Sequence, residues 1–320
     1  MAISTNNRMA TPVREFRGRV AVITGAASGI GRALALRAVD EGMKVVLADI
    51  EGRPLRALAG ELKRSGSAAI AVPTDVRRPR QIARLARRAY AAYGAVHLLF
   101  NNAGVGCSDL AWDIPDRDWE WVLGVNLWGT IHGLREFVPL MLSQGQEGHI
   151  VNTASILGLL TAPHLGAYSA SKHAVMALSE TLYQELQATG GRIGVSVLCP
   201  AFVKSGIMDS ARNRRHWFWK LFARRTGTVQ NARDAGWQRL VDLGMDGGEV
   251  ARLTFDGIRE GRFYIAAHAG FQCLIDRRLE NLRQQRNPAP FDMREVIAAA
   301  RVGADPDAGR SDCGNNGDGL

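Results

Sequence analysis

Two residues that could exchange a proton, Tyr168 and Lys172, lie four positions apart in the stretch GAYSASKHAV. Residues spaced by four lie on one face of a helix, about one turn apart. A positive charge beside a phenol favours the phenolate, so Lys172 would lower the pKa of Tyr168 from its usual value of about 10. Such a tyrosine could serve as a general acid or base near neutral pH. An ordinary helix face with a solvated lysine would carry the same pair, so other features of the chain must distinguish the two interpretations.

The apolar run at 19–25 leads directly into a glycine-rich stretch, TGAASGIG, at 24–31. Its glycines, Gly25, Gly29 and Gly31, would permit a tight turn and let backbone N–H groups approach a pyrophosphate. The amphipathic segment after the turn predicts a helix, whose N-terminus favours an anion. A strand, a glycine turn and a helix in this order predict a dinucleotide site.

Asp49 ends the second apolar run, at the position where a carboxylate can bind the ribose hydroxyls of adenosine. The same carboxylate would repel a 2′-phosphate. The alternative is an aspartate that only caps the next helix. Arg32 and Arg53 lie nearby, but neither occupies the usual phosphate-binding position. The sequence therefore favours NAD as cofactor, with NADP as the alternative.

The elements that must position these groups alternate between β-rich runs and longer helical patterns. The β-rich runs are apolar throughout, as is typical of parallel strands covered by helices on both faces. This alternation predicts an α/β fold: a single doubly wound Rossmann domain with a mainly parallel sheet of about seven strands flanked by helices. The runs are 19–25, 44–50, 68–76, 95–102, 148–155, 194–200 and 261–267.

The two ends of the chain differ in composition from its middle. Residues 1–15 are polar and predict a disordered extension. We expect the Rossmann domain to span 16–290, since no linker interrupts that range. Residues 291–320 would then form a C-terminal extension, disordered from about residue 303.

The chain is basic, with a formal net charge of +9 and a pI of about 9.9. No nucleic-acid-binding module is recognisable, and the arginines of 80–94 fall mostly off the apolar face of a predicted helix, so we expect no nucleic-acid partner. The four cysteines form no close pair, which suggests neither a metal site nor a disulfide framework. With no signal peptide or membrane-spanning run, we expect a cytoplasmic protein.

Further motifs, in a fixed order, resemble those of the short-chain dehydrogenase/reductase family. Asp75–Val76 ends the third predicted strand, and the NNAG sequence at 101–104 follows the fourth. Ser155 precedes Tyr168 and Lys172, which completes a Ser–Tyr–Lys pattern. PAFVKS (200–205) resembles the family's PGxxxT loop, with alanine replacing glycine and serine replacing threonine. The resemblance covers about residues 17–270.

This resemblance implies roles for individual residues. Tyr168 would be the general acid or base, and Lys172 would lower its pKa and hold the nicotinamide ribose. Ser155 would bind the substrate oxygen, and Asn126 would hold a water molecule that relays protons from Lys172. These four residues are the predicted catalytic set, and no metal ion is required. The predicted cofactor-binding residues are Gly25, Ser28, Gly29, Ile30, Gly31, Asp49, Asp75, Val76, Asn102, Ala103, Gly104, Tyr168, Lys172, Pro200, Val203 and Ser205.

The resemblance places a substrate lid at about 206–245 and names no substrate. Within it, 212–225 mixes tryptophan, phenylalanine and leucine with arginine. This segment could form the wall of a pocket for a lipophilic alcohol. It could also be an amphipathic helix on an anionic membrane surface, which we do not favour, or a lid helix with exposed arginines.

We therefore expect an oxidoreductase that transfers a hydride between NAD and a lipophilic secondary alcohol or ketone. The alternatives are an NADP-dependent ketone reductase of the same fold and a non-catalytic dinucleotide-binding regulator. Family members commonly pair the helix that carries the tyrosine across a two-fold axis, so a homodimer or homotetramer is expected.

Overall fold

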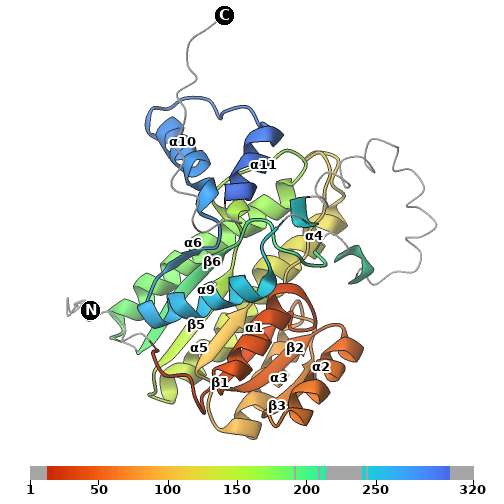
Figure 1. Ribbon diagram of the computed structural model, residues 1–320, viewed down its shortest axis with the longest axis vertical. Coiled ribbons are helices and arrows are strands. Elements are labelled where there is room, and N and C mark those ends of the chain that lie inside the picture. Colours follow the sequence, from red (N-terminus) through yellow and green to blue (C-terminus); the bar gives the residue numbers. More distant parts are fainter. Residues whose placement is uncertain (1–12, 191, 208–209, 214–239, 243, 303–320) are drawn as a thin grey trace, which may run out of the picture.

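Seven parallel strands form one sheet through the middle of the molecule (Figure 1). The computed structural model describes residues 13–190, 192–207, 210–213, 240–242 and 244–302. The strand order is β3-β2-β1-β4-β5-β6-β7, and every neighbouring pair is parallel. The predicted fold is confirmed, and the sheet is wholly rather than mainly parallel. The strands are β1 (Val20–Thr24), β2 (Lys44–Asp49), β3 (Ala69–Pro73), β4 (Leu98–Asn101), β5 (Gly148–Thr153), β6 (Ile193–Cys199) and β7 (Tyr264–Ala266).

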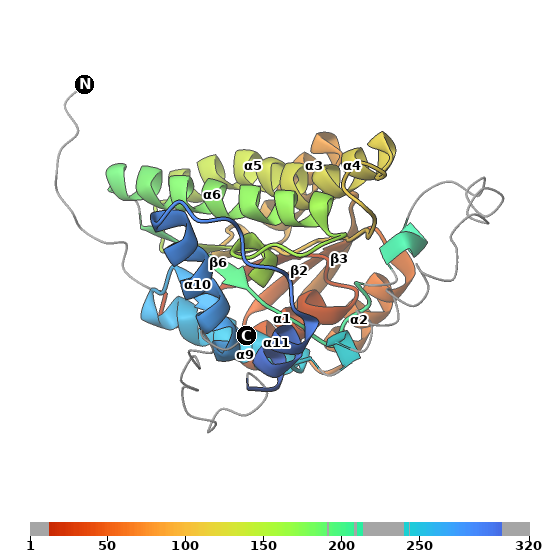
Figure 2. The ribbon, with the colours of Figure 1, turned by 90° about the horizontal axis from the view of Figure 1, so that it is seen from above.

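Helices cover both faces of the sheet, as the apolar strands require (Figure 2). One layer contains α1 (Gly29–Asp40), α2 (Gly52–Arg64) and α9 (Gly247–Glu260). The other contains α3 (Pro79–Tyr93), α4 (Asp116–Leu123), α5 (Gly129–Ser143) and α6 (Gly166–Ala188). The short helices are η1 (Gly124–Trp128), η2 (Ile156–Gly158), η3 (Ser210–Asn213) and η5 (Ala269–Phe271).

Helix α3 illustrates how the sequence pattern becomes a layer. Its apolar residues Ile82, Leu85, Ala86 and Ala89 are buried against the sheet, whereas the arginines at 84, 87 and 88 are exposed. The basic run is thus a solvated helix face, as predicted. Exposure to solvent accounts for most of the positive charge of this segment, so the charge does not indicate an anionic binding partner.

The sheet reverses its winding between β1 and β4, which are neighbours although two strands separate them in sequence. Ligands of doubly wound proteins bind beyond the carboxyl ends of the strands at such a point. The turn after β1 and the NNAG segment after β4 both lie at that edge. The fold therefore brings together the glycine turn and the motifs that the sequence analysis singled out.

One predicted domain boundary differs from the structure. Val13 is fully buried in the apolar core, although we expected residues 1–15 to be disordered. At the other end, α10 (Gln272–Arg283) and α11 (Met293–Val302) lie above the carboxyl edge of the sheet (Figure 1). Ala299 and Ala300 of α11 pack against Phe271 in a small apolar cluster of their own. The chain after 290 thus begins with a packed helix, and the tail predicted from 303 lies outside the described residues.

Two further expectations concern membranes and cysteines. No helix within the described ranges is long and apolar enough to cross a membrane. Neither Cys107 nor Cys199 forms a disulfide bond, whereas Cys273 is disulfide-bonded. The scattered cysteine positions suggested no disulfide framework, and this expectation was wrong. Sequence spacing does not reveal which distant residues meet.

Candidate active site

A single cavity of about 1450 Å³ runs along the carboxyl edge of the sheet. Nearly all of the predicted site residues line it. They are Gly25, Ser28, Gly29, Ile30, Asp49, Asp75, Val76, Asn102, Ala103, Gly104, Ser155, Tyr168, Lys172, Pro200, Val203 and Ser205. Gly31 and Asn126 are buried behind its wall. The sequence motifs therefore converge on one site.

The glycine turn is so tightly packed that side chains cannot be added to it. Gly25 has a φ of +68°, and a Cβ there would lie 2.9 Å from the Cα of Ala103. At Gly31 an added Cβ would lie 2.0 Å from the carbonyl oxygen of Gly25. Gly29, with a φ of +52°, lies directly beside Ser205, and an added Cβ there would lie 3.0 Å from the serine Cβ. Because these positions carry no side chains, the backbone N–H groups at the start of α1 stay accessible to a pyrophosphate.

Asp49 supports the glycine turn and also faces the cavity. Its carboxylate accepts hydrogen bonds from the backbone N–H groups of Ala27, at 3.0 Å, and Glu51, at 2.9 Å. Burial raises the pKa of this carboxyl group, and the two backbone hydrogen bonds oppose that rise. Each oxygen can accept a further hydrogen bond, so the capping role and the ribose-binding role are compatible.

Asp75 belongs to an ion pair at the expected adenine end of the cavity. Its carboxylate accepts two hydrogen bonds from the guanidinium of Arg77, at 3.0 and 2.8 Å. Burial opposes ionisation of Asp75, but Arg77 outweighs it and holds the pKa below its usual value. Arg77 also lines the cavity and was not among the predicted residues. Its guanidinium forms part of this wall together with Val76.

Asn102 ties the NNAG segment to the neighbouring strand. Its amide nitrogen donates to the carbonyl oxygen of Thr24 at 3.0 Å. The Thr24 hydroxyl in turn accepts hydrogen bonds from the backbone N–H groups of Asn102 and Ala103. The cavity floor is thus fixed by bonds between β1 and β4, the pair at which the sheet reverses.

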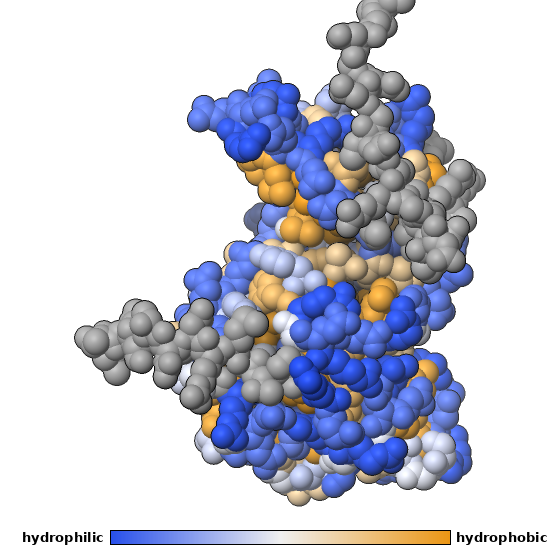
Figure 3. All heavy atoms as spheres, turned by 60° about the vertical axis from the view of Figure 1, so that its left-hand side comes forward, coloured by the Kyte–Doolittle hydropathy of each residue, from blue (hydrophilic) through white to orange (hydrophobic). Residues whose placement is uncertain are grey.

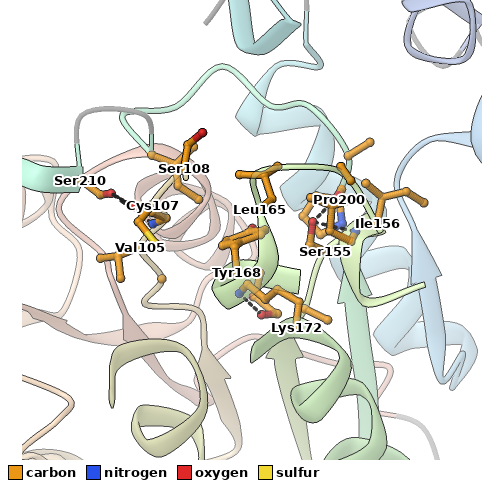
Figure 4. A pocket seen from close by; sticks show the side chains of 18 of the residues that line it. Val105, Cys107, Ser108, Ser155, Ile156, Leu165, Tyr168, Lys172, Pro200 and Ser210 are labelled. Atoms are coloured by element: carbon orange, nitrogen blue, oxygen red, sulfur yellow. Dashed lines mark hydrogen bonds between the residues drawn. The ribbon is translucent and has the colours of Figure 1, made fainter. Parts of the chain in front are cut away.

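Tyr168 lies between two walls of the cavity (Figure 4). The loop that carries Cys107 is on one side, and Ser155 with Ile156 is on the other. Burial raises the pKa of Tyr168, and a hydrogen bond with the Ser155 hydroxyl partly opposes that rise. The expected lowering by Lys172 is therefore not what the structure shows. A tyrosine in this state keeps its proton and can donate it.

The ammonium group of Lys172 is buried, and its Nζ donates to the carbonyl oxygen of Thr153 at 2.8 Å. It lies 5.6 Å from the centroid of the Tyr168 ring. Burial lowers the pKa of Lys172 to about 8, so this amine is close to losing its proton at physiological pH. The pairing predicted from the four-residue spacing exists, but the cost of burying a phenolate determines the direction in which the pKa of Tyr168 shifts.

Asn126 lies in the π-helical turn η1, and its side chain is hydrogen-bonded to the loop after Gly104 and to α6. Its side chain exchanges hydrogen bonds with the backbone of Val105, at 2.9 and 3.0 Å. It also donates to the Ser171 hydroxyl at 2.9 Å, and Ser171 donates to the backbone carbonyl of Tyr168. Asn126 thus holds the loop after Gly104 and the first turns of α6 in place.

The loop after β6 is fixed by a histidine that sequence reasoning missed. His268 accepts a hydrogen bond from the backbone N–H of Ala201 at 3.1 Å. Its other ring nitrogen pairs with the carbonyl oxygen of Phe202 at 2.9 Å and therefore carries the proton. Burial lowers the pKa of His268, which favours this neutral form. No motif surrounds His268, so only the folded structure could reveal its role.

Part of the predicted lid at 206–245 can be placed. The Ser210 hydroxyl exchanges hydrogen bonds with the backbone of Gly106, both at 3.2 Å, across the cavity from the sheet. Arg212 forms an ion pair with Glu51 at 2.7 Å. The aromatic residues at 217–222 lie outside the described residues, so their predicted role stays a hypothesis.

The far end of the cavity is covered by an element that we did not predict to be functional. Residues 271–296, which we call the C-terminal cap, contribute α10 and the start of α11. Apolar surface gathers in the hollow between this cap and the sheet domain (Figure 3). We assigned residues after 290 to a C-terminal extension, and the sequence of such a segment does not show where its helix docks.

Among the described residues, no cluster of histidine, cysteine or carboxylate side chains could hold a metal ion. The site instead offers a hydroxyl and a phenol beside a backbone cradle. It can bind a dinucleotide, hold an oxygen atom and move a proton to or from it.

Comparison with known proteins agrees with this geometry. The family model for short chain dehydrogenases matches residues 19–216. A short chain dehydrogenase/reductase from Burkholderia phymatum, solved in complex with NAD, is 46% identical, with a TM-score of 0.83 over 88% of this chain and 100% of the other. The 1-deoxy-11-beta-hydroxypentalenate dehydrogenase of Streptomyces exfoliatus is 34% identical over 89% of this chain and 96% of its own length. A C alpha-dehydrogenase from a Sphingobium strain is 32% identical over 82% and 88%.

Proposed function

This chain belongs to the short-chain dehydrogenase family, and we propose that it interconverts a lipophilic secondary alcohol and its ketone with NAD as the hydride carrier. The main support for the proposal is that Ser155, Tyr168 and Lys172 all line one wall of the long cavity. The Streptomyces exfoliatus relative is by name a dehydrogenase of a hydroxy compound. A protein of this family that only sensed a dinucleotide would have no need for the full proton-transfer set.

NAD fits the residues present. The cradle formed by Gly25 and Gly31 accepts a pyrophosphate, and Asp49 offers carboxylate oxygens for ribose hydroxyls. The related Burkholderia protein was solved with NAD. NADP is the alternative cofactor, and the nearby Arg212 is already paired with Glu51. When bound, the nicotinamide accepts or supplies the hydride.

The residues of the chain would bind the substrate, orient it and exchange a proton with its oxygen atom. The Ser155 hydroxyl would hold the substrate oxygen, and Tyr168 would donate a proton to it during reduction or accept one during oxidation. The raised pKa of Tyr168 supports the donor role at neutral pH. Lys172 would supply a positive charge near the ring, and Asn126 would position α6 through Ser171.

The walls next to Ser155 support an apolar substrate. They include Ile156, Leu157 and Leu160 from one segment and Phe202 and Leu274 from two others. Burying an apolar side chain of ordinary size against a ligand contributes about 1.5–3 kcal/mol, so several such contacts would select a lipophilic molecule. Small alcohols would leave this surface exposed to water.

The proposal is tested with a panel of secondary alcohols and ketones of graded size, with NAD and NADP and with absorbance of the reduced cofactor as readout. We expect kcat/KM to rise with apolar size and to be higher with NAD. Binding of NAD without turnover of any member of the panel would favour the regulator instead.

A further inference from the structure

The C-terminal cap presents five charged side chains to the outer part of the cavity, and three of them already belong to ion pairs. These residues are Arg277, Arg278, Arg286, Asp292 and Glu295. Arg277 pairs with Glu295 at 2.5 Å, an ion pair that joins α10 to α11. Asp292 pairs with Arg294 at 2.8 Å. Within the described part of the chain, no carboxylate lies within ion-pair distance of Arg278 or Arg286.

Arg278 is the better placed of these two cations. It is half-buried, whereas Arg286 is exposed. Its Nη1 donates to the backbone carbonyl of Leu159 at 2.8 Å, which fixes the side chain against the cavity wall. A guanidinium has five N–H donors in a planar fork, and this bond uses one of them. The remaining donors have the geometry that binds a carboxylate through two parallel hydrogen bonds.

The position of Leu159 relates Arg278 to the reacting centre. Leu159 directly follows the short helix η2, which begins one residue after Ser155. Since such a helix rises about 2 Å per residue, Leu159 lies roughly 8 Å from Ser155 along the turn. The guanidinium is therefore bound at the end of η2 that is remote from Ser155.

The space between these two polar ends is apolar. Ile156, Leu157 and Leu160 line one side, and Phe271 with Leu274 lines the side that belongs to the C-terminal cap. Figure 3 shows apolar surface in this hollow. A molecule extending from Ser155 to Arg278 would meet a hydroxyl group, then an apolar wall, then a cation.

Among the described residues, the carboxylates near Arg278 are either paired with arginines or lie on another wall of the cavity. Glu295 and Asp292 are already paired with arginines. Asp109 follows the loop that carries Ser108, and that loop lies across Tyr168 from Ser155 and Ile156 (Figure 4).

We propose that Arg278 binds a carboxylate of the substrate, so that the preferred substrates are lipophilic hydroxy acids and the corresponding keto acids. This inference rests on the proposed function for the reaction, but the carboxylate site can be tested apart from it. The apolar chamber would hold the chain that separates the acid from the reacting carbon. By holding the carboxylate, Arg278 would determine which alcohols place their hydroxyl group beside Ser155.

Binding tests the site without any reaction. Calorimetry would compare decanoate with 1-decanol on the wild-type protein, on Arg278→Gln and on Arg283→Gln. Arg283 is the matched control, because it removes one positive charge from the same helix and does not line the cavity. We expect decanoate to bind the wild type and Arg283→Gln at least about tenfold more tightly than 1-decanol, and Arg278→Gln to lose this preference. Equal decanoate affinity in Arg278→Gln and the wild type would overturn the inference, as would a wild type that prefers 1-decanol.

Turnover separates this inference from the proposed function. A series of (ω−1)-hydroxy fatty acids of increasing length would be compared with their methyl esters. For the best chain length, we expect kcat/KM to favour the acid about tenfold in the wild type and not in Arg278→Gln, with ester turnover equal in the two proteins. Arg278-dependent decanoate binding without oxidation of any hydroxy compound would leave the carboxylate site in place and refute the dehydrogenase proposal. Equal oxidation of acids and esters by the wild type would refute the carboxylate site and leave the dehydrogenase proposal in place.

Discussion

At the scale of single residues, burial governs the proton-transfer pair more than the attraction between its two members does. Burial raises the pKa of Tyr168 and lowers that of Lys172 to about 8, so each group is pushed towards its neutral form. The spacing of the two residues was readable from the sequence because both lie on one helix. Their burial depends on the loop after β4 and on β5, which are distant in sequence, so the direction of the tyrosine shift could not be read there.

Asp49 should set the choice of cofactor. Replacing it with alanine removes the carboxylate that would bind the ribose hydroxyls and repel a 2′-phosphate. We expect the wild type to prefer NAD over NADP by at least about tenfold in kcat/KM, and Asp49→Ala to narrow that ratio. Because Asp49 also accepts hydrogen bonds from Ala27 and Glu51, the stability of the variant must be measured alongside. A wild type that prefers NADP would show that another residue outweighs this carboxylate.

At the scale of elements, the sequence predicted the site residues that belong to short contiguous motifs. It did not predict those that reach the site because a distant helix or loop packs against it. The glycine turn, the NNAG segment and the Ser–Tyr–Lys series follow strands whose apolar runs are visible in the sequence. His268 and Arg278 bind segments 66 and 119 positions away through backbone carbonyls, which any residue possesses, so no motif marks them. The role of the C-terminal cap was missed for the same reason.

The glycine cradle makes a prediction at this scale. In Gly31→Ala the new methyl group would collide with the backbone of Gly25, so the turn must shift. We expect a loss of stability of about 1–3 kcal/mol and at least about tenfold weaker NAD binding. Gly60→Ala in α2 is the control, since its methyl group would meet only the end of the Arg64 side chain at 3.5 Å. That change should be neutral or slightly stabilising. Normal NAD affinity in Gly31→Ala, by titration calorimetry, would refute the role of this turn.

At the scale of the whole molecule, His149 should make the fold sensitive to acid. It lies in β5, fully surrounded by protein, and burial lowers its pKa from 6.5 to about 3. Above pH 6.5 the histidine is neutral in both states and stability is unaffected. Below it the unfolded chain binds a proton that the folded chain does not, so stability falls by about 1.4 kcal/mol per pH unit. Denaturant unfolding between pH 7 and 4 should show a flatter profile for His149→Gln, which cannot take up that proton; equal slopes would contradict the assignment.

The assembly of the molecule is a second prediction at this scale. The helical layer that contains α5 and α6 leaves large apolar side chains exposed, among them Trp128, Leu140 and Leu142. We propose that this layer pairs with a second copy to give a homodimer or homotetramer. Light scattering at micromolar concentration should report a multiple of the 34.8 kDa chain mass. A monomer under those conditions would contradict the proposal.

The central claim is that Tyr168 transfers the proton, and Tyr168→Phe tests it most directly. The substitution removes the hydroxyl group and keeps the ring that packs between the two walls of the cavity. We expect kcat to fall by at least about 100-fold with the best alcohol of the panel, while NAD binding, measured by calorimetry, stays within about twofold of the wild type. Turnover close to that of the wild type in this variant would contradict the account, because the proton would then have to move through another group.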